Sequence, residues 1–283
     1  MKRRILSSLM ALVLVFGLLP ATAFAEETPD AEPEVTAVGA PSAEEGTTPA
    51  GNTIYVDAVN GNDNSENIGQ SWETAYKTLE TAVTAAASGA TIQLGAGKYT
   101  LYKKGAVTKG KDLTFVGQGA DETSWGIGAT MPDPDKFGTE YNGDYSFDGA
   151  GTITFQNMTL QSGSADYLGF IRADNTVVED CIINGKTFYW GYKSAMFKNT
   201  TFNCPIVEKT FLGIPYTEGD YAIWTYSSPT MTFDTCTFNS SGKVINVYTD
   251  YGAGTHDITV NFKDCTVKNT ANNKQVLNVN DSN

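Results

Sequence analysis

Side chains that carry nucleophilic or metal chemistry are scarce in this sequence. It has one histidine, His256, and four cysteines among 283 residues, and no two cysteines form a CxxC pair. These absences disfavour a zinc site. No serine or cysteine lies in a nucleophile motif, which disfavours a catalytic triad. His256 precedes Asp257, so it is either a general base oriented by that carboxylate or an ordinary loop histidine.

Long apolar runs are absent apart from one at the N-terminus. Residues 1–25 begin with Met-Lys-Arg-Arg, continue with "ILSSLMALVLVFGLLP" and end in "ATAFA". A basic start, an apolar middle and a small-x-small end are typical of a secretory signal peptide. A transmembrane anchor is the alternative, but it needs about 20 apolar residues, and this run has 16. We therefore expect a secreted or cell-surface protein.

Basic residues are few in the remainder. Without Lys2, Arg3 and Arg4 the chain keeps 19 − 3 = 16 basic residues against 32 acidic ones. This balance disfavours nucleic acid and anionic membranes as partners. Residues 26–52 contain no aromatic and no basic residue and are rich in Glu, Pro, Ala and Thr. This segment predicts a disordered acidic linker.

Folded structure is expected from residue 53 to residue 283. Short alternating segments predict strands, and one segment, 71–89, predicts a helix. Ser71 is its expected N-cap, and Gly89 its expected end. An apolar stripe at helical spacing follows the segment: Ala75, Leu79, Val83 and Ala86.

Residues from 154 onward repeat a seven-residue pattern, which we call the repeat frame. The five copies are "TFQNMTL" (154–160), "VVEDCII" (177–183), "MFKNTTF" (196–202), "TFDTCTF" (232–238) and "NFKDCTV" (261–267). Stacked in register, such repeats bury a shared core. The fourth residue is Asn, Asp or Thr, which predicts a left-handed bend there. We also expect stacked Asn side chains to hydrogen-bond along this column.

The segment "IYVDAVNGNDN…SWETAYKTLETAVTAAASGATIQLGAGKYT" and the F-x-[ND]-[CMT]-T-[FLV] repeats resemble the pectin-lyase-like superfamily of right-handed parallel β-helices, across residues 53–283. The resemblance implies an all-β solenoid whose N-terminal α-helix caps the first coil. It does not imply one activity, because the superfamily includes lyases, hydrolases, tailspikes and adhesins. The N-terminal features resemble those of secreted proteins of Gram-positive bacteria. Because the sequence ends within a strand pattern, we expect a longer chain with further domains, or a partner covering the last coil.

The fifth position of the frame is small or contains sulfur: Met158, Cys181, Thr200, Cys236 and Cys265. Neighbouring coils of a parallel stack lie about 4.8 Å apart, so Cys236 and Cys265 would be adjacent. They are either packed free thiols or a disulfide. The exchange of cysteine for Met and Thr favours packing over reactivity.

Aromatic and amide side chains form the clearest candidate binding surface. Strand alternation places Ile223 and Val247 inward, and it places the following residues outward: Trp224, Tyr226, Asn246, Tyr248, Asn278 and Asn280. With Ile171 and Ala173 pointing inward, Arg172 and Asp174 begin the same column. It continues as Trp224/Tyr226, Asn246/Tyr248 and Asn278/Asn280, so that Trp224 lies beside Asn246, and Trp190 extends it. Aromatic faces beside amides and charges suit sugar rings. Alternatively, some of these rings pack in the core or beneath the loop 206–220.

Evidence for catalysis is thin. Lyases of the superfamily use calcium-bound carboxylates with an arginine or lysine base, so the resemblance makes Arg172 and Asp174 the catalytic candidates. An ordinary surface ion pair is the favoured interpretation of the two residues. Hydrolases of the superfamily need clustered aspartates, and no two aspartates are adjacent here. The acidic loop containing Asp57, Asp63 and Glu66 is either a calcium site or a solvated turn.

These observations favour a non-catalytic module that binds or adheres to an extracellular polysaccharide or a cell-surface glycan. A polysaccharide lyase or glycoside hydrolase is the alternative, and a structural stalk is a second one. No cofactor is required, with calcium as the one candidate.

Overall fold

The computed structural model describes residues 52–64, 68–99, 101, 107–126, 147, 149–161, 171, 173–184, 191–204, 207–218, 222–224, 228–240, 245–248, 257–268 and 276–280. The expected signal peptide and most of the linker lie outside these ranges. So do five of the candidate residues of the sequence analysis: Glu66, Arg172, Trp190, Tyr226 and His256.

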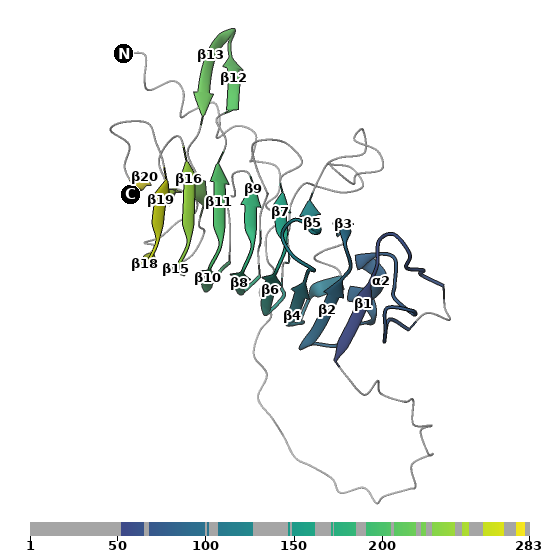
Figure 1. Cartoon of the computed structure of the whole chain (residues 1–283). Coiled ribbons are helices and arrows are strands. Elements are labelled where there is room, and N and C mark those ends of the chain that lie inside the picture. The colour runs from purple at the N-terminus through teal and green to yellow at the C-terminus, as the bar shows by residue number, and fades with distance from the viewer. Residues whose placement is uncertain are drawn as a thin grey trace, which may run out of the picture. The chain divides into compact units, whose positions relative to one another are not determined.

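Strands that are distant in the sequence lie side by side in parallel sheets (Figure 1). An eight-stranded sheet has the order β1 (Thr53–Val56), β2 (Ala90–Leu94), β4 (Leu113–Val116), β6 (Thr152–Gln156), β8 (Asn175–Glu179), β10 (Ser194–Lys198), β15 (Thr230–Asp234) and β18 (Thr259–Lys263). A seven-stranded sheet has the order β19 (Thr266–Lys268), β16 (Thr237–Ser240), β11 (Thr201–Cys204), β9 (Ile182–Asn184), β7 (Thr159–Gln161), β5 (Thr123–Gly126) and β3 (Gly97–Tyr99).

Two smaller sheets complete the described strands. A three-stranded parallel sheet has the order β14 (Ala222–Trp224), β17 (Ile245–Tyr248) and β20 (Leu277–Asn280). Strands β12 (Val207–Phe211) and β13 (Ile214–Glu218) form an antiparallel hairpin.

Each repeat frame connects the two long sheets. Its first three residues end a strand of the eight-stranded sheet, the next two form a bend, and the last two begin a strand of the seven-stranded sheet. The frames pair residue for residue, so their second positions align as Phe155, Val178, Phe197, Phe233 and Phe262. The predicted in-register stack is therefore confirmed. Two long parallel sheets joined in this way are typical of a parallel β-helix-like solenoid.

The predicted left-handed bend is present in every frame. The backbone φ angle is positive at all five fourth positions: Asn157 (55°), Asp180 (55°), Asn199 (45°), Thr235 (58°) and Asp264 (52°). Asn and Asp adopt this conformation at modest cost, whereas a β-branched residue such as Thr235 is strained in it.

The core lies between the sheets and consists of the inward positions of each coil. Phe155, Phe197 and Phe233 are no more than 1% exposed. In the last frame Phe262 is 38% exposed, because no described coil packs on its far side. The phenylalanine rings stack face to face along the coils, with centroids 4.9 Å apart for Phe197 and Phe233 and 5.3 Å apart for Phe233 and Phe262.

Helix α2 (Leu79–Ala85) is shorter than the predicted helix 71–89. Thr78, and not Ser71, is the N-cap, and its side chain accepts a hydrogen bond from the backbone N–H of Thr81. The prediction failed because the preceding chain pairs with β1: the backbone N–H of Tyr76 donates to the Tyr55 carbonyl oxygen at 3.0 Å.

The predicted apolar stripe of the helical segment is correct. Ala75, Leu79, Val83 and Ala86 are no more than 3% exposed, and the last three belong to the same core cluster as the strands. Among the described residues, no helix is long and apolar enough to cross a membrane.

Candidate functional site

The predicted aromatic and amide column lies on the three-stranded sheet. Its backbone register pairs Trp224 with Tyr248 and Tyr248 with Asn280, while Asn246 pairs with Asn278. Val247, between the two predicted outward positions of β17, is 1% exposed, as expected for an inward residue. The register differs by two residues from the predicted one, in which Trp224 lay beside Asn246. A shift of two residues keeps the same alternate residues on each face of the sheet. The column therefore still aligns two aromatic residues, Trp224 and Tyr248, with Asn280.

The start of the predicted column differs from the sequence interpretation. Ile171 and Ala173 are buried, as predicted. Asp174 forms an ion pair with Lys193 of the next coil, with Nζ and Oδ2 2.6 Å apart. The sequence interpretation missed Lys193, although its distance of 19 residues from Asp174 is the spacing of the frames that contain Val177 and Met196. Coil stacking therefore accounts for the position of Asp174 beside Lys193.

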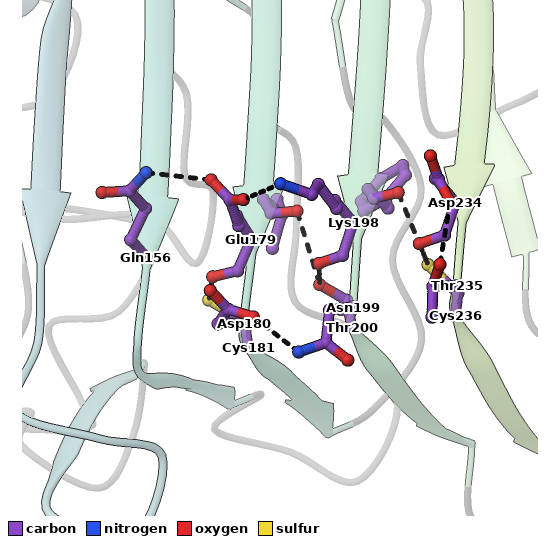
Figure 2. A network of polar contacts seen from close by, with 12 residues as sticks. Gln156, Glu179, Asp180, Cys181, Lys198, Asn199, Thr200, Asp234, Thr235 and Cys236 are labelled. Atoms are coloured by element: carbon purple, nitrogen blue, oxygen red, sulfur yellow. Dashed lines mark hydrogen bonds and ion pairs between the residues drawn. The ribbon is translucent and has the colours of Figure 1, made fainter.

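A ladder of alternating charges follows the third position of the frame on the outer face of the eight-stranded sheet (Figure 2). We call its members the charge ladder: Glu179, Lys198, Asp234 and Lys263. Lys198 donates to Glu179 at 2.5 Å, and Lys263 donates to Asp234 at 2.8 Å. These hydrogen bonds from lysine lower the pKa of Glu179 and of Asp234. The ladder was not predicted, although the alternating signs at the third position are visible in the sequence.

Amides form a second ladder in the seven-stranded sheet. The side-chain amide of Asn203 donates to Asn184 at 2.8 Å, and that of Asn239 donates to Asn203 at 2.7 Å. Stacked amides were expected at the bend instead. At the bend, the side-chain amide of Asn199 donates to Asp180 at 2.6 Å. The bend alternates between amide, acid and hydroxyl, so it offers fewer matched pairs than the uniform asparagine column.

The fifth-position side chains are packing residues that also satisfy backbone carbonyls. Cys181, Cys236 and Cys265 are free thiols, and Cys181 and Cys236 are no more than 2% exposed. The Cys236 thiol donates to the carbonyls of Asp234 and Phe197 at 3.5 Å each. Thr200 donates to the equivalent carbonyls of its own and the preceding coil. Thr and Cys suit the position because both are small donors, whereas Met158 fills the equivalent position in the first frame without a hydrogen to donate.

Burial determines the reactivity of these thiols. It raises the pKa of Cys181 and Cys236 to about 12. A nucleophilic or metal-binding cysteine needs the thiolate at neutral pH, and both groups stay protonated there. The prediction that these cysteines pack rather than react is consistent with this chemistry.

Asp57 and Asp63 of the acidic loop accept hydrogen bonds from nearby protein donors. Asp57 accepts hydrogen bonds from the backbone N–H groups of Val59 and Asn60 at 2.8 and 2.9 Å. Asp63 accepts from the backbone N–H of Lys77 and from the Thr78 hydroxyl, both at 2.8 Å. Within the described ranges, no three His, Cys, Asp or Glu residues are grouped so that they could hold a metal ion.

Comparison with known proteins leaves the geometry as the basis for assigning a function. No family model matches the chain, and no curated protein or solved structure matches it.

Proposed function

We propose that this protein is a secreted or cell-surface module that binds glycans without cleaving them. We propose further that it is a right-handed parallel β-helix of the pectin-lyase-like superfamily, with α2 covering the first coil. The in-register frames, the left-handed bends and the buried apolar stripe of α2 support this more specific assignment. The N-terminal sequence pattern of residues 1–25 supports export.

The observation that carries the glycan proposal is the register of the three-stranded sheet. Trp224, Tyr248 and Asn280 occupy one column, and Asn246 and Asn278 occupy the next position of the same parity. Aromatic rings stack on the C–H faces of sugars, and amides bond to their hydroxyls. A parallel sheet repeats these groups about every 4.8 Å, which suits a polymeric ligand.

Trp224→Ala tests this proposal. The full chain and the variant are passed over immobilised neutral and uronate polysaccharides, and retention is measured. Loss of retention with Trp224→Ala, but not with Leu212→Ala on the hairpin, is the expected result. Leu212 is a suitable control because it is 83% exposed and lies in the turn of the β12–β13 hairpin, outside the three-stranded sheet.

The same samples separate binding from catalysis. New reducing ends or unsaturated products would show that the protein is a hydrolase or a lyase and would overturn the non-catalytic proposal. Retention that is equal for the two variants and the parent chain would overturn the assignment of the site.

A further inference from the structure

The outer face of the eight-stranded sheet changes character along its length. The first four strands, β1, β2, β4 and β6, contain no charged residue, whereas each of the last four contributes one member of the charge ladder. We call six of the outward side chains of β2, β4 and β6 the neutral face: Thr91, Gln93, Thr114, Val116, Thr154 and Gln156. The whole chain has a formal net charge of −13, so four neighbouring strands without a charged residue are a distinct chemical surface. Carboxylates border it: Asp112, just before β4, accepts from the Thr152 backbone N–H at 2.6 Å, and Glu179 accepts from the Gln156 side-chain amide at 3.1 Å.

The neutral face is regular. Thr91, Thr114 and Thr154 align in register across three strands. Each is half-buried, and the residues that alternate with them, such as Ile92, Phe115 and Phe155, are no more than 1% exposed. The hydroxyls are therefore held on a rigid backbone at intervals of about 4.8 Å.

Two aromatic rings lie at the first-coil end of the neutral face. Tyr55 of β1 pairs in register with Gln93. The Trp72 and Tyr55 rings pack edge to face, with centroids 4.8 Å apart and planes at 66°, and Trp72 is 42% exposed. A tryptophan that is held by a neighbouring ring and is partly exposed to solvent offers a fixed surface for stacking.

We propose that the neutral face binds an uncharged polysaccharide that crosses the strands and stacks one sugar ring on Trp72. A pyranose unit in an extended chain is close in length to the spacing between strands, so successive sugars meet successive hydroxyls. Desolvation of a charged side chain would oppose the binding of a neutral polysaccharide, and these four strands have no charged side chain to desolvate. The acidic protein repels uronates, and the paired charges at Glu179 and Lys198 mark the other end of the surface. This site is separate from the aromatic column on the three-stranded sheet.

Binding of cellohexaose, xylohexaose and mannohexaose to the full chain, measured by calorimetry with trigalacturonate as the charged counterpart, tests the proposal. We expect at least one neutral hexaose to bind, and Kd to rise about tenfold in Trp72→Ala and about tenfold in the double variant Thr91→Val/Thr114→Val. Valine keeps the shape and strand preference of threonine and removes only the hydroxyl.

Thr232→Val is the matched control, because Thr232 lies in the same column at the charged end of the sheet, and it should leave Kd unchanged. Absence of binding by every neutral hexaose would overturn the proposal, as would equal binding of trigalacturonate. If Trp224→Ala abolishes binding while the Trp72 and threonine variants do not change it, the neutral face is not a site, although the glycan-binding function proposed above stands. If the neutral-face variants alone weaken binding, the neutral face is the site and the assignment to the three-stranded sheet fails.

Discussion

The two halves of the eight-stranded sheet share a backbone but differ on both of their faces. In β1, β2, β4 and β6 the outer face is neutral, and the core beneath it holds Trp125 edge-on to Phe115 and Phe155. In β8, β10, β15 and β18 the outer face carries the charge ladder, and the core beneath β10, β15 and β18 is a column of the face-stacked rings Phe197, Phe233 and Phe262. The stack therefore depends on apolar inward positions and left-handed bends, and it leaves the outward positions free for other roles.

The largest effect is expected from the phenylalanine column. Phe233 is fully buried and stacks on both Phe197 and Phe262, so Phe233→Ala should lower the free energy of unfolding by about 3–5 kcal/mol. Phe262→Ala is the control, since Phe262 is 38% exposed and should cost clearly less. The free energies of unfolding are measured in urea. Equal decreases in the two variants would mean that another surface covers the last coil in solution, so that the inner and last coils do not differ in burial.

A smaller effect is expected at the bends, where Asn157 follows β6 in the first half and Thr235 follows β15 in the second. Thr235 has φ 58° and Asn157 has φ 55°, and the left-handed conformation suits Asn far better than a β-branched residue. Thr235→Asn should raise the free energy of unfolding by about 1 kcal/mol, and Asn157→Thr should lower it by a similar amount. A loss of stability with Thr235→Asn would instead show that the bond from the Thr235 hydroxyl to Asp234 at 2.8 Å dominates.

The smallest effect concerns the charge ladder. The hydrogen bond from Lys198 lowers the pKa of folded Glu179, so this group stabilises the protein above its unfolded-state pKa. That contribution disappears as the pH falls through the lower, folded-state pKa. Glu179→Gln should therefore flatten the acid limb of the stability profile and weaken its dependence on salt.

Glu122→Gln, on the exposed turn before β5, is the control for this measurement and should leave the acid limb in place. An unchanged stability profile in Glu179→Gln would show that the ion pair of Glu179 makes no measurable contribution to stability, and that the charge ladder does not distinguish the stability of the two halves.

The sequence predicted the parts of the fold that repeat. Inward apolar residues recur in one frame, which predicts the core positions. The bend residues Asn157, Asp180 and Asn199 share a preference for the left-handed backbone, which predicts the bends. The start of α2 could not be predicted from the sequence. The backbone of Tyr76 pairs with β1, and its hydrogen bond to Tyr55 competes with local helix formation.

The candidate site was less predictable than the fold. The parity of Trp224 and Tyr248 follows from strand alternation, but their register depends on connections outside the repeat frame, and the prediction was two residues off. The partner of Asp174 belongs to the next coil, where only stacking brings Lys193 close. The Trp72–Tyr55 pair joins a turn to a strand and carries no periodic pattern.

The hairpin β12–β13 is an insertion between strands of the stacked coils, and the coils keep their register around it. Between β11 and β15 the polypeptide leaves for the hairpin, turns at Leu212 and Gly213 with positive φ at both residues, and returns so that Phe233 still pairs with Phe197. Lengthening such an excursion costs little entropy, because the cost of closing a loop rises only with the logarithm of its length. The tip of this hairpin is accordingly a natural insertion point, where a reporter or a second recognition domain could be displayed while the coils on either side keep their alignment.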